Sequence, residues 1–473
     1  MNKAINEILK QNKQSHLLKF YEDLDKNQQK SLMSSLQDIN WEELNILIQS
    51  HVLNKPESEI PDDLEPAPFF PGKPVNDEQE KLYIQAEQKG KMLLSKGSVA
   101  AFTVAGGQGT RLGFDGPKGT YPITPIKHKT LFQYFAESIK RASGKYNSVI
   151  PWYIMTSEMN DITTRDFFED NSYFGLSSEN VMFFKQGTMP VLDHKGKILF
   201  EDKGSIAIAP NGHGGSLLAL RNSGALDDMK NRGIDYISFF QVDNPLVSVV
   251  NPLLIGLHAI EKSEMSSIML SKTGPFEKLG NFCISKGRLM IIEYSDIPDE
   301  LAEKKDSNGK LCFIGGSPAI HVISRHFVER LTEDGFISLP WHRADKKVSY
   351  LDENGEKIIP DEANAVKLET FIFDALPLAD KTIILEADRD KEFGPTKNKI
   401  GVDSVESCRE MLIARDSEWL EEFAGISIPK NSDGKIDCEV ELSPLKYIDG
   451  EDVLNDLDLR GQVIAKREKV YIE

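Results

Sequence analysis

Apolar runs alternate with amphipathic stretches from Ser98 to about Leu385. This alternation is typical of an α/β protein, in which buried strands are separated by helices that cover a sheet. The expected strands are 98–104, 152–156, 181–185, 236–242, 267–270 and 382–386. Helical composition covers 76–95 and 404–423, and Thr130 followed by Gln133 predicts the start of a helix over 130–141.

The first 53 residues predict helices. Asn40 with Glu43 three positions later predicts a helix start. Two sets of apolar residues recur at helical spacing, namely Leu17, Leu18, Tyr21 and Leu24, and then Leu44, Leu47 and Ile48. Six prolines fall within residues 56–74, too many for a helix or a central strand, so we expect an extended strap there.

Length and pattern together predict three parts. A chain of 473 residues is too long for one ordinary core. We expect a helical N-terminal region over 1–95 that includes the strap, a catalytic domain over 96–395, and a small α+β C-terminal domain over 396–473. In the last part a helix is followed by short strand-like pieces that end at Ile472.

Charge and cysteine content narrow the class of protein. The net charge of −18 argues against a general nucleic-acid binder, which needs a basic surface, but leaves room for a local nucleotide site. The four cysteines are far apart, which predicts neither a zinc site nor a disulfide framework and fits a reducing compartment. No apolar run has the length of a membrane span, and the first residues lack a signal-peptide core. These features predict a cytoplasmic protein without a membrane partner.

A glycine-rich loop follows the first predicted strand of the sheet. Gly106, Gly107, Gly109 and Gly113 are four glycines in eight residues, and Gly116 and Gly119 follow. Such a loop at the carboxyl end of a strand can form a nest of backbone N–H groups for an anion. Arg111 and Lys118 add positive charge, so the loop predicts a nucleotide-phosphate site. It matches neither the P-loop nor the G-x-G-x-x-G dinucleotide pattern.

Three further segments carry candidate chemistry. Asp243 ends the predicted strand 236–242, where a carboxylate can hold Mg²⁺ together with phosphate oxygens, although a turn or helix cap is the alternative. Gly212, Gly214 and Gly215 surround His213 in a second loop. Either the backbone of this loop comes close to a ligand, or the loop is a tight surface turn. Gln186, just after the predicted strand 181–185, could offer its amide to a base edge, although most Gln residues at strand ends face water.

In order along the chain, these segments resemble the eukaryotic-type UDP-sugar pyrophosphorylases, most closely the UDP-N-acetylhexosamine pyrophosphorylases, over about residues 65–400. The resemblance implies a Rossmann-like nucleotidyltransferase domain with a mixed central sheet, flanked by a helical N-terminal region and a small C-terminal domain. It implies catalytic roles for Arg111, Lys118 and Lys397 and a metal role, for Mg²⁺ or Mn²⁺, for Asp243. Implied nucleotide-binding residues are Ala105, Gly106, Gly107, Gly109, Thr110, Lys118, Gln186 and Gly212; implied sugar-binding residues are His213, Gly280, Glu293, Ser317, Phe373 and Lys397.

Two positions depart from the family pattern. His213 stands where the hexosamine enzymes usually have Asn, and Ser317 stands where an Asn commonly lies near the N-acetyl group. Losing a directed amide partner weakens discrimination for the acetylated sugar. The implied reaction joins UTP and a sugar 1-phosphate, in the first place N-acetylglucosamine 1-phosphate, to give a UDP-sugar and pyrophosphate.

Other functions stay open from the sequence. One is a UTP–glucose-1-phosphate uridylyltransferase or a broad UDP-sugar pyrophosphorylase. A metal-dependent glycosyltransferase would typically show D-x-D, whereas Val242-Asp243-Asn244 has one carboxylate. A non-catalytic UDP-sugar-binding protein is the third. We expect small-molecule substrates as partners, and a monomer or weak homo-oligomer.

Overall fold

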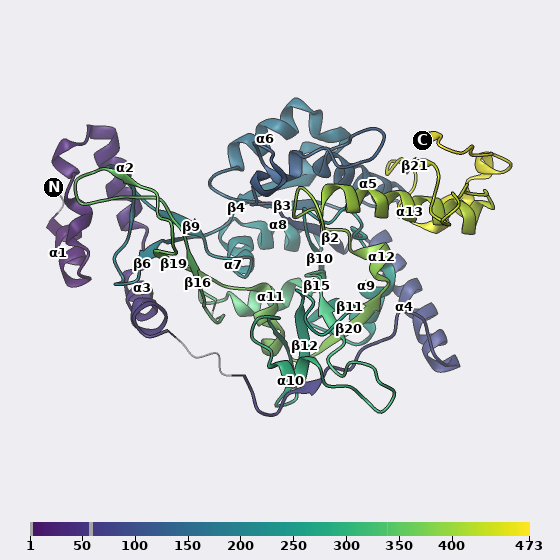
Figure 1. The fold of residues 1–473 in the computed structure, drawn as a ribbon, viewed down its shortest axis with the longest axis horizontal. Helices are drawn as coiled ribbons and strands as arrows, with labels where there is room; N and C mark the ends of the chain where they lie inside the picture. The colour runs from purple at the N-terminus through teal and green to yellow at the C-terminus, as the bar shows by residue number, and fades with distance from the viewer. Residues whose placement is uncertain (1–2, 56–59, 338) are drawn as a thin grey trace. The chain divides into compact units, whose positions relative to one another are not determined.

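The computed structural model describes residues 3–55, 60–337 and 339–473, which fall into two compact units (Figure 1). The first unit comprises residues 1–59, 186–216 and 338–375, and the second comprises 60–185, 217–337 and 376–473. These units cut the chain at positions other than the predicted domain boundaries near 95 and 395, which stay predictions. Part of the predicted strap, residues 56–59, lies outside the described residues.

A mixed sheet forms the centre of the second unit, as predicted. Within the described residues it has eleven strands, with the order β1-β12-β14-β11-β15-β10-β2-β3-β4, while β13 pairs with β12 and β20 with β11. The strand bounds are β1 Glu65–Pro66, β2 Val99–Val104, β3 Trp152–Thr156, β4 Val181–Lys185, β10 Tyr236–Gln241, β11 Met265–Ser271, β12 Gly280–Ser285, β13 Arg288–Ile292, β14 Gly315–Ser317, β15 His321–Ser324 and β20 Thr382–Ala387. All six predicted strands are confirmed, with ends shifted by up to two residues.

The strands β10, β2, β3 and β4 run parallel, in register from Tyr236 beside Val99 and from Trp152 beside Val181. Their carboxyl ends therefore meet at one edge of the sheet, where α/β proteins place ligands. The strap contributes β1, a two-residue strand at the outer end of the sheet that pairs with β12. An edge position suits proline, which donates no ladder hydrogen bond.

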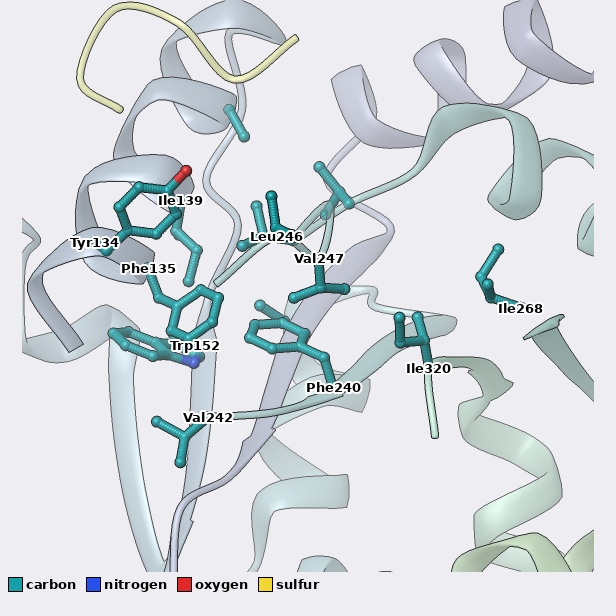
Figure 2. Packing of buried hydrophobic residues seen from close by; sticks show 14 of the residues in the cluster. Tyr134, Phe135, Ile139, Trp152, Phe240, Val242, Leu246, Val247, Ile268 and Ile320 are labelled. Atoms are coloured by element: carbon teal, nitrogen blue, oxygen red, sulfur yellow. The ribbon is translucent and has the colours of Figure 1, made fainter. Parts of the chain in front are cut away.

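Helices of the second unit cover this sheet. Their bounds are α4 Asp77–Ser95, α5 Leu131–Lys145, α6 Asp161–Asp170, α8 Ala225–Arg232, α9 Pro252–Ile260, α10 Asp299–Ala302, α11 Arg325–Leu331 and α12 Arg389–Glu392; α7 Gly215–Asn222 spans the boundary between the units. Thr130 caps α5 by accepting from the Gln133 N–H, as predicted. Figure 2 shows Phe135 of α5 packed against Trp152 and Phe240 of the sheet, and the Phe135 and Phe240 ring centroids are 5.0 Å apart. Among the described helices, none is long and apolar enough to cross a membrane.

The end of the second unit has a small core of its own. Helix α13 (Val405–Ala424) is followed by β21 (Glu439–Leu442), α14 (Gly450–Asn455) and β22 (Lys469–Ile472), and the two strands pair in parallel. Leu420, Val440 and Val453 are fully buried in this cluster. The predicted helix over 404–423 is confirmed, with Ser404 as its N-cap.

The first unit is built from three separated stretches of chain. Its helices are α1 Lys3–Gln11, α2 Lys26–Gln37 and α3 Trp41–Leu47; its strands are β5 Thr188–Pro190, β6 Leu192–Asp193, β7 Phe200–Asp202, β8 Ser205–Ile206, β9 Ile208–Pro210, β16 His342–Lys346, β17 Tyr350–Leu351, β18 Lys357–Ile358 and β19 Ala365–Glu369. Leu9, Leu36 and Leu44 of the helices share one core with Leu192, Phe200 and Val366 of the strands. This shared core explains why strands from the middle of the sequence group with the N-terminal helices.

One local prediction in this unit is wrong. The stretch with Leu17, Leu18, Tyr21 and Leu24 forms two short 3₁₀ turns, Ser15–Leu18 and Tyr21–Asp23, in place of one helix. Leu17 and Leu24 are nevertheless buried. The core therefore takes up the apolar residues without needing the helical backbone that their spacing predicted. The predicted cap of α3 is confirmed, because the Asn40 side chain accepts from the Glu43 N–H.

Candidate functional site

The glycine-rich loop leaves the carboxyl end of β2 and folds back on itself. The Gly109 N–H donates to the Gly116 carbonyl at 2.9 Å, and the Lys118 N–H donates to the Gly107 carbonyl at 3.0 Å. Gly113 and Gly116 have φ values of 71° and 148°, which favour glycine. Within the described parts of the chain, the N–H groups of Gly106, Gly107 and Gln108 donate to no protein acceptor. These consecutive free donors, beginning just after Ala105, are suited to an anion.

Charged side chains flank this loop. The Lys118 Nζ lies 3.1 Å from the Asp243 Oδ2, and the two side chains are only 15 % and 12 % exposed. Asp243 follows β10, the parallel neighbour of β2, so the order of the strands brings these distant residues together. Arg111, on the 3₁₀ turn Thr110–Leu112, is exposed and forms no ion pair with any described residue. Two cations and one carboxylate thus lie on loops at the same edge of the sheet.

The donor set fits Mg²⁺ only together with a phosphate ligand. Across residues 3–55, 60–337 and 339–473, no group of three His, Cys, Asp or Glu side chains is arranged to hold a metal ion. Mg²⁺ commonly uses one or two carboxylates, several waters and substrate phosphate oxygens. Asp243 alone matches that mode, and it does not match an all-protein metal cage.

Asn244 ties the loop after β10 to the segment that leads to Lys397. Its Nδ2 donates to the Glu392 carbonyl at 2.8 Å, and its Oδ1 accepts from the Gly394 N–H at 2.9 Å. The Thr396 N–H also donates to the Asp243 carbonyl at 2.7 Å. These bonds hold the backbone of Thr396, the residue before Lys397, against the backbone of Asp243. The Lys397 Nζ lies 5.4 Å from the centre of the Phe393 ring.

A cavity of about 220 Å³ lies beside this junction. Asp243, Gly280, Glu293, Ser317 and Lys397 all line it, although they come from five separate stretches of sequence. Gly280 begins β12 and pairs with Ser317 on β14, so the sheet itself places these two on adjacent strands. The structure therefore brings together the metal candidate and four of the six predicted sugar-binding residues.

The second glycine-rich loop belongs to the first unit and packs on a neighbouring turn. The Gln186 Nε2 donates to the Gly212 carbonyl at 2.7 Å, which links two of the predicted nucleotide-binding residues. Gly212 has a φ of 85°, and the Gly214 N–H donates to the Thr370 carbonyl at 2.8 Å. A Cβ at Gly214 would overlap the backbone of Thr370 and Phe371. Glycine is required here for close backbone packing as well as for conformation.

His213 is held in one orientation and one tautomer. Its Nδ1 accepts from the Ile372 N–H at 3.1 Å, so the ring proton is on Nε2. Its ring stacks on Phe371 at 5.3 Å between centroids, and Phe373 meets it edge-on at 5.8 Å. Burial, followed by the nearby His342, lowers the pKa of His213 to about 4. Near neutral pH His213 is therefore an uncharged side chain that offers one N–H donor.

Other residues of this arrangement were not found from the sequence. His342 stacks on Phe371 at 4.4 Å and contacts Asp374 through its Nε2 at 2.8 Å. Lys278 lines the cavity, although it stands in a charged loop that sequence patterns would assign to solvent. The partners of Asn244 are about 150 residues away in sequence, so no local pattern could indicate its role.

Comparison with known proteins is consistent with this geometry. The family model described as UTP–glucose-1-phosphate uridylyltransferase matches residues 54–442. The UDP-N-acetylglucosamine pyrophosphorylase of Saccharomyces cerevisiae is 36 % identical over 343 residues, covering 70 % of this chain and 72 % of the yeast protein. The UDP-N-acetylglucosamine diphosphorylase 2 of Arabidopsis thaliana is 31 % identical over 475 residues, covering 96 % of this chain and 91 % of the plant protein.

A solved structure extends the match to the fold. The uridine diphosphate N-acetylglucosamine pyrophosphorylase of Trypanosoma brucei, in complex with an inhibitor, superposes with a TM-score of 0.80 at 26 % identity, covering 100 % of this chain and 98 % of that one. The match to the family model covers most of the chain, and the relatives exceed 30 % identity over more than two thirds of it. This chain belongs to the UTP–glucose-1-phosphate uridylyltransferase family of UDP-sugar pyrophosphorylases.

Proposed function

We propose that this chain converts UTP and N-acetylglucosamine 1-phosphate to UDP-N-acetylglucosamine and pyrophosphate. The observation that carries the proposal is the cavity in which Asp243 and Lys397 meet Gly280, Glu293 and Ser317, beside the Lys118 ammonium. It joins groups that bind phosphate to groups that hydrogen-bond a sugar. The names of the relatives favour the acetylated sugar over glucose 1-phosphate.

The reaction needs positive charge more than a nucleophilic side chain. A phosphate oxygen of the sugar phosphate attacks the α-phosphorus of UTP in line, and pyrophosphate leaves. Because both substrates are anions, the site must offset their repulsion and the charge that develops in the transition state. Lys118 and Arg111 would bind the UTP phosphates and Lys397 the sugar phosphate, and holding both substrates in line supplies the remaining advantage. Mg²⁺ or Mn²⁺ held by Asp243 would add Lewis-acid stabilisation of phosphate oxygens.

The ion pair between Lys118 and Asp243 has a role in the free protein. Each side chain neutralises the other while it is largely withdrawn from water. When the UTP phosphates bind, they offer Lys118 a second anionic partner and leave Asp243 available for a cation. The charges of Lys118 and Asp243 thus balance each other before substrate binds.

His213 and Ser317 bear on the choice of sugar. The Nε2–H of His213 is a directed donor, which is the property that an Asn amide would supply at this position. The Ser317 Oγ accepts from the Ala319 N–H at 3.3 Å, so its own hydroxyl proton is available to a ligand. Both substitutions therefore keep a hydrogen-bond donor and are compatible with an acetylated sugar.

Pyrophosphate release tests the proposal. UTP and Mg²⁺ are supplied with N-acetylglucosamine 1-phosphate or glucose 1-phosphate in parallel, and we expect faster turnover of the acetylated sugar. Faster turnover of glucose 1-phosphate would establish the alternative substrate. Release of UDP would indicate a glycosyltransferase, and nucleotide binding without turnover would indicate a binding protein. The cytoplasmic location and the monomeric or weakly oligomeric state stay predictions.

A further inference from the structure

Asn160 is a fully engaged, buried side chain next to the glycine-rich loop. It is 1 % exposed and stands one residue before α6. Its Nδ2 donates to the Ala105 carbonyl at 2.9 Å and to the Gly107 carbonyl at 3.4 Å. Its Oδ1 accepts from the N–H and the hydroxyl of Ser157, at 2.8 and 3.0 Å. Both amide protons and both oxygen lone pairs therefore have partners.

The position of Asn160 makes this use of its side chain unusual. A residue at the start of a helix normally caps it, by accepting from an N–H of the first turn. Asn160 makes no such bond to α6. Its hydrogen-bonding capacity is directed away from its own helix and onto the loop that follows β2.

The two captured carbonyls determine the direction of two N–H groups. In a trans peptide the carbonyl and the following N–H point in opposite directions, and the described chain contains no cis peptide. With the Ala105 and Gly107 carbonyls turned toward Asn160, the N–H groups of Gly106 and Gln108 point away from it. These are two of the three loop donors without a protein acceptor among the described residues.

We propose that Asn160 is a positioning residue that sets the phosphate-binding direction of the Gly106 and Gln108 N–H groups. The loop needs such a support because glycine leaves its peptide planes free to rotate. The bond from the Lys118 N–H to the Gly107 carbonyl fixes only one of the two planes. Asn160 fixes both, and because it is buried it acts through the backbone without touching the ligand.

Asn160→Asp is the sharpest perturbation. The side chain keeps its size and an oxygen that accepts from Ser157, but its second oxygen would repel the Ala105 and Gly107 carbonyls. Rotation of those peptides relieves the repulsion and turns the N–H groups toward Asp, away from a phosphate. Asn160→Ala is the milder variant, since it removes the support without adding repulsion. Asn171→Asp is the matched control, because it removes a similar bond, to the Phe167 carbonyl at 2.8 Å, at the other end of α6.

The test compares binding of UTP and uridine to the full chain by calorimetry. We expect Asn160→Asp to weaken the binding of UTP by about a hundredfold or more, the loss of two hydrogen bonds to an anion, while the affinity for uridine changes less than twofold. The KM for UTP should rise while the KM for the sugar phosphate stays within twofold. Asn160→Ala should show the same pattern more weakly, and Asn171→Asp should match the wild type.

The outcomes separate this inference, which rests on the proposed function, from that function itself. If the wild type makes the UDP-sugar but Asn160→Asp keeps the wild-type ratio of UTP to uridine affinity, the positioning role is wrong. Equal weakening of UTP and uridine in both variants would also overturn it, because it would indicate general damage to the fold. If the wild type prefers UTP to uridine but releases no pyrophosphate, the proposed reaction is wrong. The UTP and uridine affinities of the Asn160 variants still decide whether Asn160 positions the loop.

Discussion

Replacing Lys118 by Met removes one charge from the centre of the site and leaves the rest of the loop in place. The side chain keeps its length, and the backbone N–H of residue 118 still donates to the Gly107 carbonyl. A change in rate therefore reports the ammonium group and not the shape of the loop. Lys96→Met is the matched control, because Lys96 is an exposed lysine at the end of α4.

The structure sets the size of the effect. At the observed 3.1 Å, two unit charges attract by about 5 kcal/mol at an effective dielectric constant of about 20. Loss of hydration by two nearly buried groups offsets much of that attraction. If about half is realised against the phosphates in the transition state, kcat/KM for UTP falls about a hundredfold, or about 2.7 kcal/mol.

Steady-state pyrophosphate release measures kcat/KM for UTP in the wild type, in Lys118→Met and in the control Lys96→Met. We expect kcat/KM to fall in Lys118→Met and to stay at the wild-type value in Lys96→Met. A kcat/KM of Lys118→Met within threefold of the wild type would refute the electrostatic reasoning.

Three further predictions test other parts of the structure. Asn244→Asp keeps the acceptor for the Gly394 N–H but loses the donor to the Glu392 carbonyl, so kcat/KM should fall at least about tenfold. In a double-mutant cycle with Lys397→Ala, the loss of kcat/KM in the double variant should be smaller than the two single losses combined. His213→Phe keeps the aromatic stack but lacks the Nε2–H, so the kinetic preference for N-acetylglucosamine 1-phosphate over glucose 1-phosphate should drop about tenfold; an unchanged ratio would contradict the donor role. His258, buried between the hydroxyls of two serines, has a pKa lowered to about 3 by burial. Because the unfolded chain binds this proton near pH 6.5, the wild type should lose up to about 1.4 kcal/mol of stability per pH unit below 6.5, and His258→Gln should lose less when urea unfolding is compared at pH 7 and 5.

The parts of this molecule that sequence patterns predicted are those with local causes. The strands β2, β3, β4 and β10 are continuous apolar runs, and the caps of α3 and α5 are short polar spacings, so each was visible within a few residues. The roles of Asn160 and Asn244 depend on partners about 55 and 150 residues away, and neither residue stands out in its own segment.

Sequence patterns could not indicate the division into two units, because it also depends on contacts between distant parts of the chain. Strand β6 has two residues and pairs with β19 some 170 positions later, which no window of sequence can indicate. The backbone around Leu17 and Leu24 shows the converse case, in which helical spacing was present but the chain formed two 3₁₀ turns. Of the four residues that the spacing indicated, Leu17 and Leu24 are buried, while Leu18 and Tyr21 are only partly buried.

The three-part construction of the first unit has a consequence for biosynthesis. The apolar faces of α1, α2 and α3 share their core with Leu192, Phe200 and Val366, which the ribosome adds much later. At about 10 residues per second, roughly 30 s separate the synthesis of α3 from that of β19. During that interval the N-terminal helices have no complete core to join. Their apolar faces are therefore exposed on the nascent chain, where a chaperone can bind them.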